Sequence, residues 1–503
     1  MTNRRATFIL ACTLLPAACT SRTLESPAIN PAASVSNIQT YHQNNKLDLL
    51  FMIDNSLSMK TMQQKLEEQL PGFMQVLKDN ASGLPDVHIA VVSSDMGAPS
   101  DTQISTCGAT GDQGKFQYKA QGACTGTTLA DGATFLSDSN GIANFTGQIT
   151  DVFQCIALLG DLGCGFEHQL ASIDRALGAD GQGPPPAQNA GFLRDDAILA
   201  IVLLTNEDDC SAPPNTTLYS ENGGKENLSN PLGPLGGGFR CNRYGHLCKD
   251  PVTGQTGMPP LTPPADATGN PPMLALQDCT SNDTDSGLLT PVSKFINDIR
   301  GLKTDPDNQI LVSAIAAPAA PYGVVWRTDN NTANEAWPEI MHSCGVGPGV
   351  TNPAAETTTD GSFGDPAVRI QQFLGGFQDS VFASVCEPSY AGALAAIANR
   401  INQKFAPPCV TAKIAKTASG TPACNVSDRI FNGTNNNWGD QELQNCDENG
   451  NQPPCWRLQS GGTTCAGQVL VVNESSANQA ATTIQRTMEC VLCLPGTSQP
   501  GCD

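Results

Sequence analysis

Apolar positions between residues 46 and 405 follow two different periods. Short apolar runs of strand length, such as KLDLLFMID (46–54), DVHIAVVSSD (86–95) and DDAILAIVLLTN (195–206), alternate with segments whose apolar residues recur every three or four positions. Runs of the first kind predict buried strands, and segments of the second kind predict amphipathic helices. Their alternation predicts an α/β fold with a doubly wound, mostly parallel sheet.

The predicted elements can be placed on the chain. We expect a further strand at 308–318, and helices at 60–80, 147–160, 165–178, 287–302, 365–377 and 390–405. The first helix contains Pro71, which predicts a kink because proline removes one backbone hydrogen bond.

Changes in composition divide the chain into domains. Residues 20–45 are polar and aperiodic, which predicts a tether. The α/β domain then spans 46–405, with insertions at 97–146 and 210–285 that are rich in glycine, proline and polar residues. Residues 406–503 carry many cysteines and short β-like runs such as GQVLVVNES (467–475), and they predict a small, disulfide-stapled, β-rich module.

The first 19 residues are typical of an export signal. Arg4 and Arg5 precede an apolar run that leads to LLPAAC, which ends at Cys19 and resembles a bacterial lipobox. This predicts a lipid on Cys19, although Pro16 departs from the usual aliphatic residue. Thr20, in place of an aspartate, favours sorting to the outer membrane. Secretion without a lipid, or a periplasmic location, is the alternative.

Cysteine usage agrees with export. Of the 20 cysteines, Cys12 and Cys19 belong to the signal, and the even number that remains predicts disulfides in an oxidising compartment. The candidates are Cys107, Cys124, Cys155, Cys164, Cys210, Cys241, Cys248, Cys279, Cys344, Cys386, Cys409, Cys424, Cys446, Cys455, Cys465, Cys490, Cys493 and Cys502. Sequence alone does not fix their pairing, but we expect Cys241 and Cys248, or their neighbours, to staple the second insertion.

The net charge of the chain limits the classes of partner that it is expected to bind. Formal net charge is −21, which argues against nucleic acid and against an anionic membrane face. A membrane contact is therefore expected only through the lipid on Cys19. A divalent cation, or solubility alone, accounts for the acidity better.

The candidate chemistry follows the first predicted strand. Asp54, Ser56 and Ser58 come directly after LLFMI, at the carboxyl end of a strand, where open α/β sheets bind ligands. Carboxylate and hydroxyl oxygens suit a hard cation such as Mg²⁺ or Ca²⁺. The alternative is that Asp54 and Ser56 only cap the helix that follows.

FMIDNSLSM (51–59) resembles the metal-ion-dependent adhesion site of von Willebrand factor type A (vWA) domains. The order of predicted elements also resembles that fold, and VHIAVVSSDMGA, GCGFEHQLASIDRAL and FLRDDAILAIVLLTNEDDCS resemble secreted or lipid-anchored vWA proteins of myxobacteria and related bacteria. The resemblance implies a binding protein rather than an enzyme, which uses a divalent cation to capture an acidic group of a protein partner at the cell surface or in the envelope.

The resemblance carries over incompletely to the remaining ligands. Where the family has a threonine, near Cys164 and Gly165, this chain has none, and Glu167 is the nearest oxygen donor. The family's second aspartate is replaced by Asn206, which Glu207 and Asp208 follow. The predicted ligand set is therefore Asp54, Ser56, Ser58, Asn206 and Asp208, with Asp95, Glu167 and Glu207 as further candidates.

Two alternatives stay open. A disulfide-braced envelope protein could bind partners through its inserted loops without a metal. A metal-dependent hydrolase could hold two metals on Asp54, Asp95, Glu207 and Asp208, although no nucleophile or base is evident for it.

Overall fold

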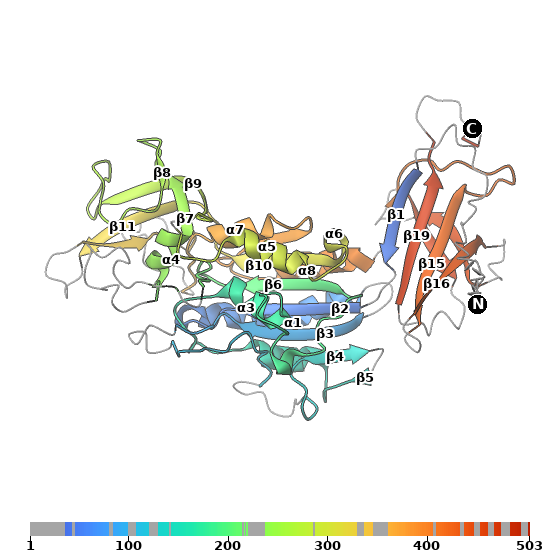
Figure 1. Ribbon diagram of the computed structural model, residues 1–503, viewed down its shortest axis with the longest axis horizontal. Coiled ribbons are helices and arrows are strands. Elements are labelled where there is room, and N and C mark those ends of the chain that lie inside the picture. Colours follow the sequence, from blue (N-terminus) through green and yellow to red (C-terminus); the bar gives the residue numbers. More distant parts are fainter. Residues whose placement is uncertain are drawn as a thin grey trace, which may run out of the picture.

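The computed structural model consists of three β-sheets with helices around the first one (Figure 1). It describes residues 36–42, 46–79, 84–98, 107–119, 129–139, 142–213, 216, 218–219, 237–284, 287–328, 336–345, 361–405, 409–432, 437–446, 453–460, 467–473, 483–493 and 501–502. The predicted signal and Cys19 lie outside these residues. Among the helices described, none has the length and apolar character needed to cross a membrane.

The first sheet confirms the predicted mostly parallel α/β domain. Its strands, in spatial order, are β13 (Ser380–Ser384), β10 (Ile310–Ala316), β6 (Ile198–Leu204), β2 (Lys46–Ile53), β3 (Asp86–Ser93), β4 (Leu136–Ser139) and β5 (Ile142–Ala143). The strands from β13 to β3 are parallel, and β4 and β5 add an antiparallel edge. The insertion at 97–146 therefore extends this sheet.

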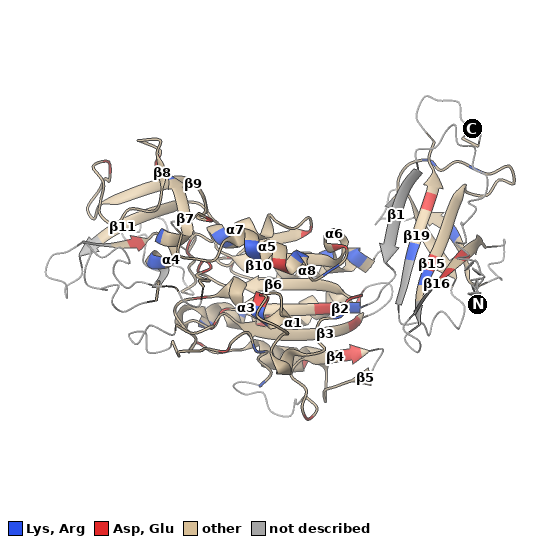
Figure 2. Ribbon diagram, viewed as in Figure 1, with Lys and Arg blue, Asp and Glu red and all other residues tan. Residues whose placement is uncertain are grey.

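Helices cover both faces of the first sheet, because its strands are buried on both sides. One face packs against α1 (Lys60–Lys78), α2 (Ile149–Ala157) and α8 (Ala391–Phe405). The other face packs against α3 (Gln169–Leu177), α5 (Val292–Arg300) and α7 (Val368–Leu374). Successive residues of β6 alternate between these two cores, as the period of a strand requires. Figure 2 shows β6 and β10 without charged residues.

The helices predicted from periodicity are all present. Helix α1 runs unbroken through Pro71. Three short elements complete the domain: η1 (Leu57–Met59), η2 (Ala187–Asn189) and α6 (Pro306–Gln309).

The second sheet lies beyond the carboxyl ends of the parallel strands (Figure 1). It is antiparallel and consists of β12 (Ala336–Ile340), β11 (Tyr322–Thr328), β9 (Met273–Ser281), β7 (His246–Lys249) and β8 (Thr256–Gly257), with α4 (Gly237–Gly245) leading into β7. The insertion at 210–285 thus supplies three strands of a small sheet with its own core.

The third sheet is the predicted β-rich module. Its order is β1 (Ser36–His42), β19 (Thr483–Val491), β15 (Cys424–Asn432), β16 (Asn437–Asn445), β17 (Cys455–Ser460), β18 (Gln468–Asn473) and β14 (Cys409–Val410). The pairing of β1 with β19 corrects the predicted tether at 20–45, since seven of its residues form a strand. Backbone hydrogen bonds to a strand from the far end of the chain order this polar segment.

Seven disulfides join described residues: Cys107–Cys164, Cys210–Cys241, Cys248–Cys279, Cys344–Cys386, Cys424–Cys490, Cys446–Cys455 and Cys493–Cys502. Cys155 is also disulfide-bonded. The expected staple of the second insertion is present, but between neighbouring cysteines: Cys241 bonds to Cys210 and Cys248 to Cys279, because Cys241 in α4 and Cys248 in β7 are buried in different cores. The candidates Cys124 and Cys465 lie outside the described residues, and the side chain of Cys409 is not described. This disulfide content indicates an extracytoplasmic protein.

Candidate functional site

Asp54 lies at the topological switch point of the first sheet. The chain passes from β2 to β3 on one side of β2 and then returns to β6 on the other side. The carboxyl ends of β2 and β6 therefore form the crevice where open α/β sheets bind ligands. Asp54 follows β2 there, and Thr205 and Asn206 follow β6.

The carboxylate of Asp54 is fully buried and held by three donors. Its Oδ1 accepts hydrogen bonds from the backbone N–H of Ser56 at 2.8 Å and from the hydroxyl of Ser94 at 3.1 Å. Its Oδ2 accepts one from the hydroxyl of Thr205 at 2.7 Å. Burial raises the pKa of Asp54, and these hydrogen bonds oppose the rise. The carboxylate is thus fixed in one orientation at the end of the strand.

The two serines point toward the end of β6. Their hydroxyl oxygens are 3.3 Å apart, and Ser58 donates to Oδ1 of Asn206 at 3.0 Å. Neither η1 nor α1 has a side-chain cap. The capping alternative required the hydroxyl of Ser56 to cap the helix that follows. Neither serine hydroxyl does so. The Nδ2 atom of Asn206 is buried and has no hydrogen-bond partner among the described residues.

Two glutamates add carboxyl groups to this cluster. Burial is the largest effect that raises the pKa of Glu167, and the charges of Glu207 and Asp54 add to it. Burial likewise raises the pKa of Glu207, with further contributions from Asp365 and Asp54. These mutual effects indicate that the carboxyl groups of Asp54, Glu167 and Glu207 lie near one another. We call the group formed by Asp54, Ser56, Ser58, Glu167, Asn206 and Glu207 the oxygen cluster.

Asp208, predicted as a ligand, is directed elsewhere. Its carboxylate accepts the backbone N–H groups of Arg369 and Ile370, at 2.8 and 3.1 Å, and pairs with Nε2 of His246 at 2.6 Å. The first N–H groups of a helix have no partner within the helix, so a carboxylate is favoured at the start of α7. Asp208 therefore joins the loop after β6 to α7 and to the second sheet.

One carboxylate oxygen of Asp95 is held by the loop that follows β3. Its Oδ1 accepts the backbone N–H of Gly97 at 2.8 Å. Burial raises the pKa of Asp95, and the charge of Asp112 adds to the rise. The hydrolase alternative, which named Asp54, Asp95, Glu207 and Asp208, stays a prediction; among these residues, Asp208 is engaged by His246 and by the start of α7.

Several residues of the site were missed from the sequence. Ser94 and Thr205 donate to Asp54, and Gln169 donates to the hydroxyl of Thr205 at 2.9 Å. Thr205 precedes Asn206 at the end of a predicted strand, so its position could have indicated its role. The contact of Ser94 and Gln169 with the site depends on the packing of β3 and α3, which sequence spacing does not show.

A close backbone approach brings another loop to the cluster. The N–H of Gly163 donates to the carbonyl of Asn55 at 2.7 Å. A Cβ atom on Gly163 would come within 2.2 Å of Oδ1 of Asn55, so only glycine fits this contact. The neighbouring Cys164 is tied to Cys107, which fixes the loop that leads to Glu167.

The loop after β6 is further fixed by a buried ion pair. Arg369 donates to Oδ2 of Asp209 from both Nε and Nη2, at 3.1 and 2.9 Å, and both side chains are fully buried. His246, the partner of Asp208, also contacts the hydroxyl of Tyr322 on β11 at 2.9 Å. The second sheet and α7 together therefore hold the segment that carries Asn206 and Glu207.

The donor set of the oxygen cluster fits a hard cation. Among the described residues, no three or more His, Cys, Asp or Glu side chains are arranged to hold a metal. Hydroxyl and amide oxygens make up half of this cluster, however, and together with carboxylates they are the ligands that Mg²⁺ and Ca²⁺ prefer. Buried like charges are costly unless a proton or a cation neutralises them. The residues present thus suit Mg²⁺ or Ca²⁺ and not a thiolate- or imidazole-seeking metal.

Comparisons with known proteins give no family. No family model matches the chain, and no curated protein matches it. Among solved structures, the pilus adhesin RrgA from Streptococcus pneumoniae is similar at a TM-score of 0.26 and 11% identity, over 91% of this chain. The match spans 58% of the adhesin's own length. A likeness of this size supports no statement about fold family or function.

Proposed function

We propose that this protein is an extracytoplasmic binding protein of the vWA type, which holds a divalent cation on its oxygen cluster and uses it to capture an acidic group of a protein partner. The observation that carries the proposal is the convergence of Asp54, Ser56, Ser58 and Asn206 at the switch point of a doubly wound sheet. The cation is Mg²⁺ or Ca²⁺. Glu167 and Glu207 supply additional negative charge beside it.

The roles of the chain's own residues follow from their contacts. Asp54 supplies a carboxylate fixed by Ser94 and Thr205, and the two serines supply hydroxyl oxygens. Asn206 supplies an amide oxygen without adding charge. A bound cation would offer a positive centre to a partner's carboxylate, which an acidic protein without a cation would repel.

Attachment to the envelope is the second part of the proposal. LLPAAC and Thr20 support a lipid on Cys19 and an outer-membrane location, and the disulfides support export. Cells labelled with a palmitate analogue should yield a labelled protein, and a Cys19→Ala variant should be unlabelled and released. A Cys19→Ala protein that stays with the membrane would contradict the anchor and leave the cation site untouched.

Calorimetric titration of Mg²⁺, Ca²⁺ and Mn²⁺ into the mature protein tests the cation site. We expect one site per chain, which a Ser56→Ala, Ser58→Ala double variant loses. The matched control is Ser293→Ala with Ser419→Ala, which removes two exposed hydroxyls that are not part of the cluster and should leave binding unchanged. If the wild type binds no ion at millimolar concentration, the proposal fails and the metal-independent envelope protein is favoured.

A further inference from the structure

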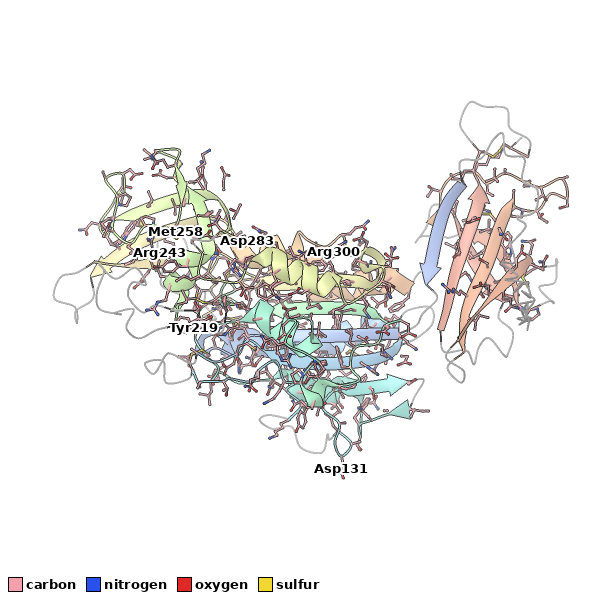
Figure 3. All side chains as sticks on the ribbon, in the orientation of Figure 1. Asp131, Tyr219, Arg243, Met258, Asp283 and Arg300 are labelled. Atoms are coloured by element: carbon pink, nitrogen blue, oxygen red, sulfur yellow. A yellow bond between two sulfur atoms is a disulfide. The ribbon has the colours of Figure 1, made fainter. Side chains whose placement is uncertain are left out.

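A pocket of about 800 Å³ lies beside the oxygen cluster, at the same end of the first sheet. Its walls are α3, the start of α5, and residues of the described segments 96–97, 109–115, 180–187, 212–213 and 219. Its volume is that of a small-molecule site. Tyr219, labelled in Figure 3, belongs to its wall, near the carboxyl ends of the parallel strands. Glu167 contributes to the oxygen cluster, whereas the next residue, His168, lines this pocket.

One face of α3 and two aromatic rings form the floor. His168, Ala171 and Asp174 follow one another at helical spacing along the pocket side of α3. Phe295 and Tyr219, both buried, add apolar surface. A ligand would therefore meet polar atoms on one side and ring faces on another.

Two polar atoms of this floor are buried and have no hydrogen-bond partner among the described residues: Nδ1 of His168 and Oδ1 of Asp174. Both residues are more than nine-tenths buried. The hydroxyl of Tyr219 donates its hydrogen to the carbonyl of Cys210 at 2.7 Å, so Nε2 of His168, at 2.7 Å, donates to the hydroxyl oxygen. In a neutral imidazole this leaves Nδ1 as a hydrogen-bond acceptor. Buried acceptors of this kind normally have a donor, which a ligand in the pocket would supply.

Basic and acidic side chains both line the pocket, and two pairs of them lie close together. Arg175 pairs with Asp180 at 3.1 Å, and Nζ of Lys294 lies 3.6 Å from Oδ2 of Asp174. An anionic ligand would meet Asp180, and a cationic one would meet Lys294 and Lys115. An apolar ligand would leave the buried acceptors without donors. A neutral ligand that both donates and accepts hydrogen bonds fits all of these groups.

We propose that this pocket binds a neutral saccharide. Its hydroxyls would donate to His168 and Asp174 and accept from Lys294 and Lys115, and the apolar face of a sugar ring would lie against Phe295. This ligand is distinct from the cation and the acidic partner of the proposed function, and its binding does not depend on them.

The test is saturation-transfer NMR and calorimetry on the full mature protein. The probes are glucose, galactose, mannose and N-acetylglucosamine at millimolar concentration, with their disaccharides and with a soluble polysaccharide of each. We expect at least one sugar to bind. Binding of the free sugar alone would indicate a small-molecule ligand, whereas tighter binding of the polysaccharide would indicate a glycan chain; each result supports the proposal.

Two variants connect binding to the pocket. Ala171→Trp fills the pocket from α3, and Asp174→Leu removes the buried acceptor at similar volume; each should weaken binding by about tenfold or more. Asp307→Leu is the matched control, since Asp307 pairs with Arg300 and neither residue lines the pocket, and it should bind as the wild type does. The Ser56→Ala, Ser58→Ala variant should also bind sugar normally. Absence of binding to every probe, or unchanged binding by a folded Ala171→Trp or Asp174→Leu protein, would overturn the proposal.

Discussion

The first and third sheets are stabilised in different ways, although both lie in one chain. The first sheet is buried on both faces, with one large apolar core against α1, α2 and α8 and another against α3, α5 and α7. The third sheet has one small core, which includes Val426, Leu443, Trp456 and Met488. It also has three disulfides between described residues and charges of both signs on its strands (Figure 2). The comparison indicates that apolar burial dominates in the first region and that specific cross-links matter more in the second.

The path of the chain relates the two regions. Strand β1 belongs to the third sheet, and β2, which begins only a few residues later, belongs to the first. The chain then returns to the third sheet at β14. The α/β domain is thus inserted between the first strand of the β module and the rest of it.

The largest effect is expected from a buried ion pair in the third sheet. Arg486 donates to both oxygens of Asp428, at 2.6 and 2.7 Å, and both side chains are buried. Asp428→Ala removes the carboxylate that neutralises this buried guanidinium and should lower the free energy of unfolding of the module by about 3–5 kcal/mol. Urea unfolding followed by the fluorescence of Trp456 measures it. Asp440→Ala breaks an exposed pair with Arg429 in the same sheet and should cost below about 1 kcal/mol. Equal losses in the two variants would show that burial does not distinguish these pairs.

The second-largest effect is expected from the removal of a disulfide in the third sheet, which should destabilise that sheet but not the first. Cys424 and Cys490 face each other on β15 and β19. Replacing both by serine should destabilise the module by about 2–5 kcal/mol and leave the α/β domain folded. Limited proteolysis with mass analysis should show cleavage confined to residues after 405 and to the segment before 46. The comparison fails if the α/β domain becomes susceptible at the same protease concentration.

A smaller, pH-dependent effect is expected in the α/β domain. Burial, with a contribution from Asp298, raises the pKa of Asp174 to about 8. A carboxyl whose pKa is raised on folding holds its proton in the folded state, so the wild type loses stability as pH rises from about 4 toward 8. Asp174→Asn does not titrate, and its melting temperature should exceed that of the wild type by a margin that grows over this range and levels off above pH 8. A margin that is constant with pH would show that Asp174 is not perturbed.

The α/β domain could be predicted from the sequence because the apolar spacing of its strands and that of its helices are each visible within one short segment. Each strand of β2, β3, β6 and β10 is a continuous apolar run, and each covering helix shows its own spacing. The second sheet was not predicted, since β9 and β11 pair across α5 and β10, which belong to the first domain. Strand β1 is polar, and its partner β19 lies at the other end of the chain. Long-range pairing of this kind leaves no local signal.

The candidate site was predicted in part for a similar reason. Asp54, Ser56 and Ser58 lie on one short loop, and their convergence follows from spacing. Within NEDD (206–209), by contrast, the direction of each side chain depends on distant partners. Asp208 is turned away by His246 and the start of α7, and Asp209 by Arg369. Only Asn206 and Glu207 are left beside Asp54.

Electron paramagnetic resonance of Mn²⁺ tests the central claim most directly, because bound and free ions give distinct signals. Titration of Mn²⁺ into the mature protein should remove the signal of free Mn²⁺ up to one ion per chain, and excess Mg²⁺ should restore it. The Ser56→Ala, Ser58→Ala protein should leave the free signal unchanged, whereas Ser293→Ala with Ser419→Ala should behave as the wild type does. Retention of the full free-ion signal by the wild type would contradict a cation site on the oxygen cluster.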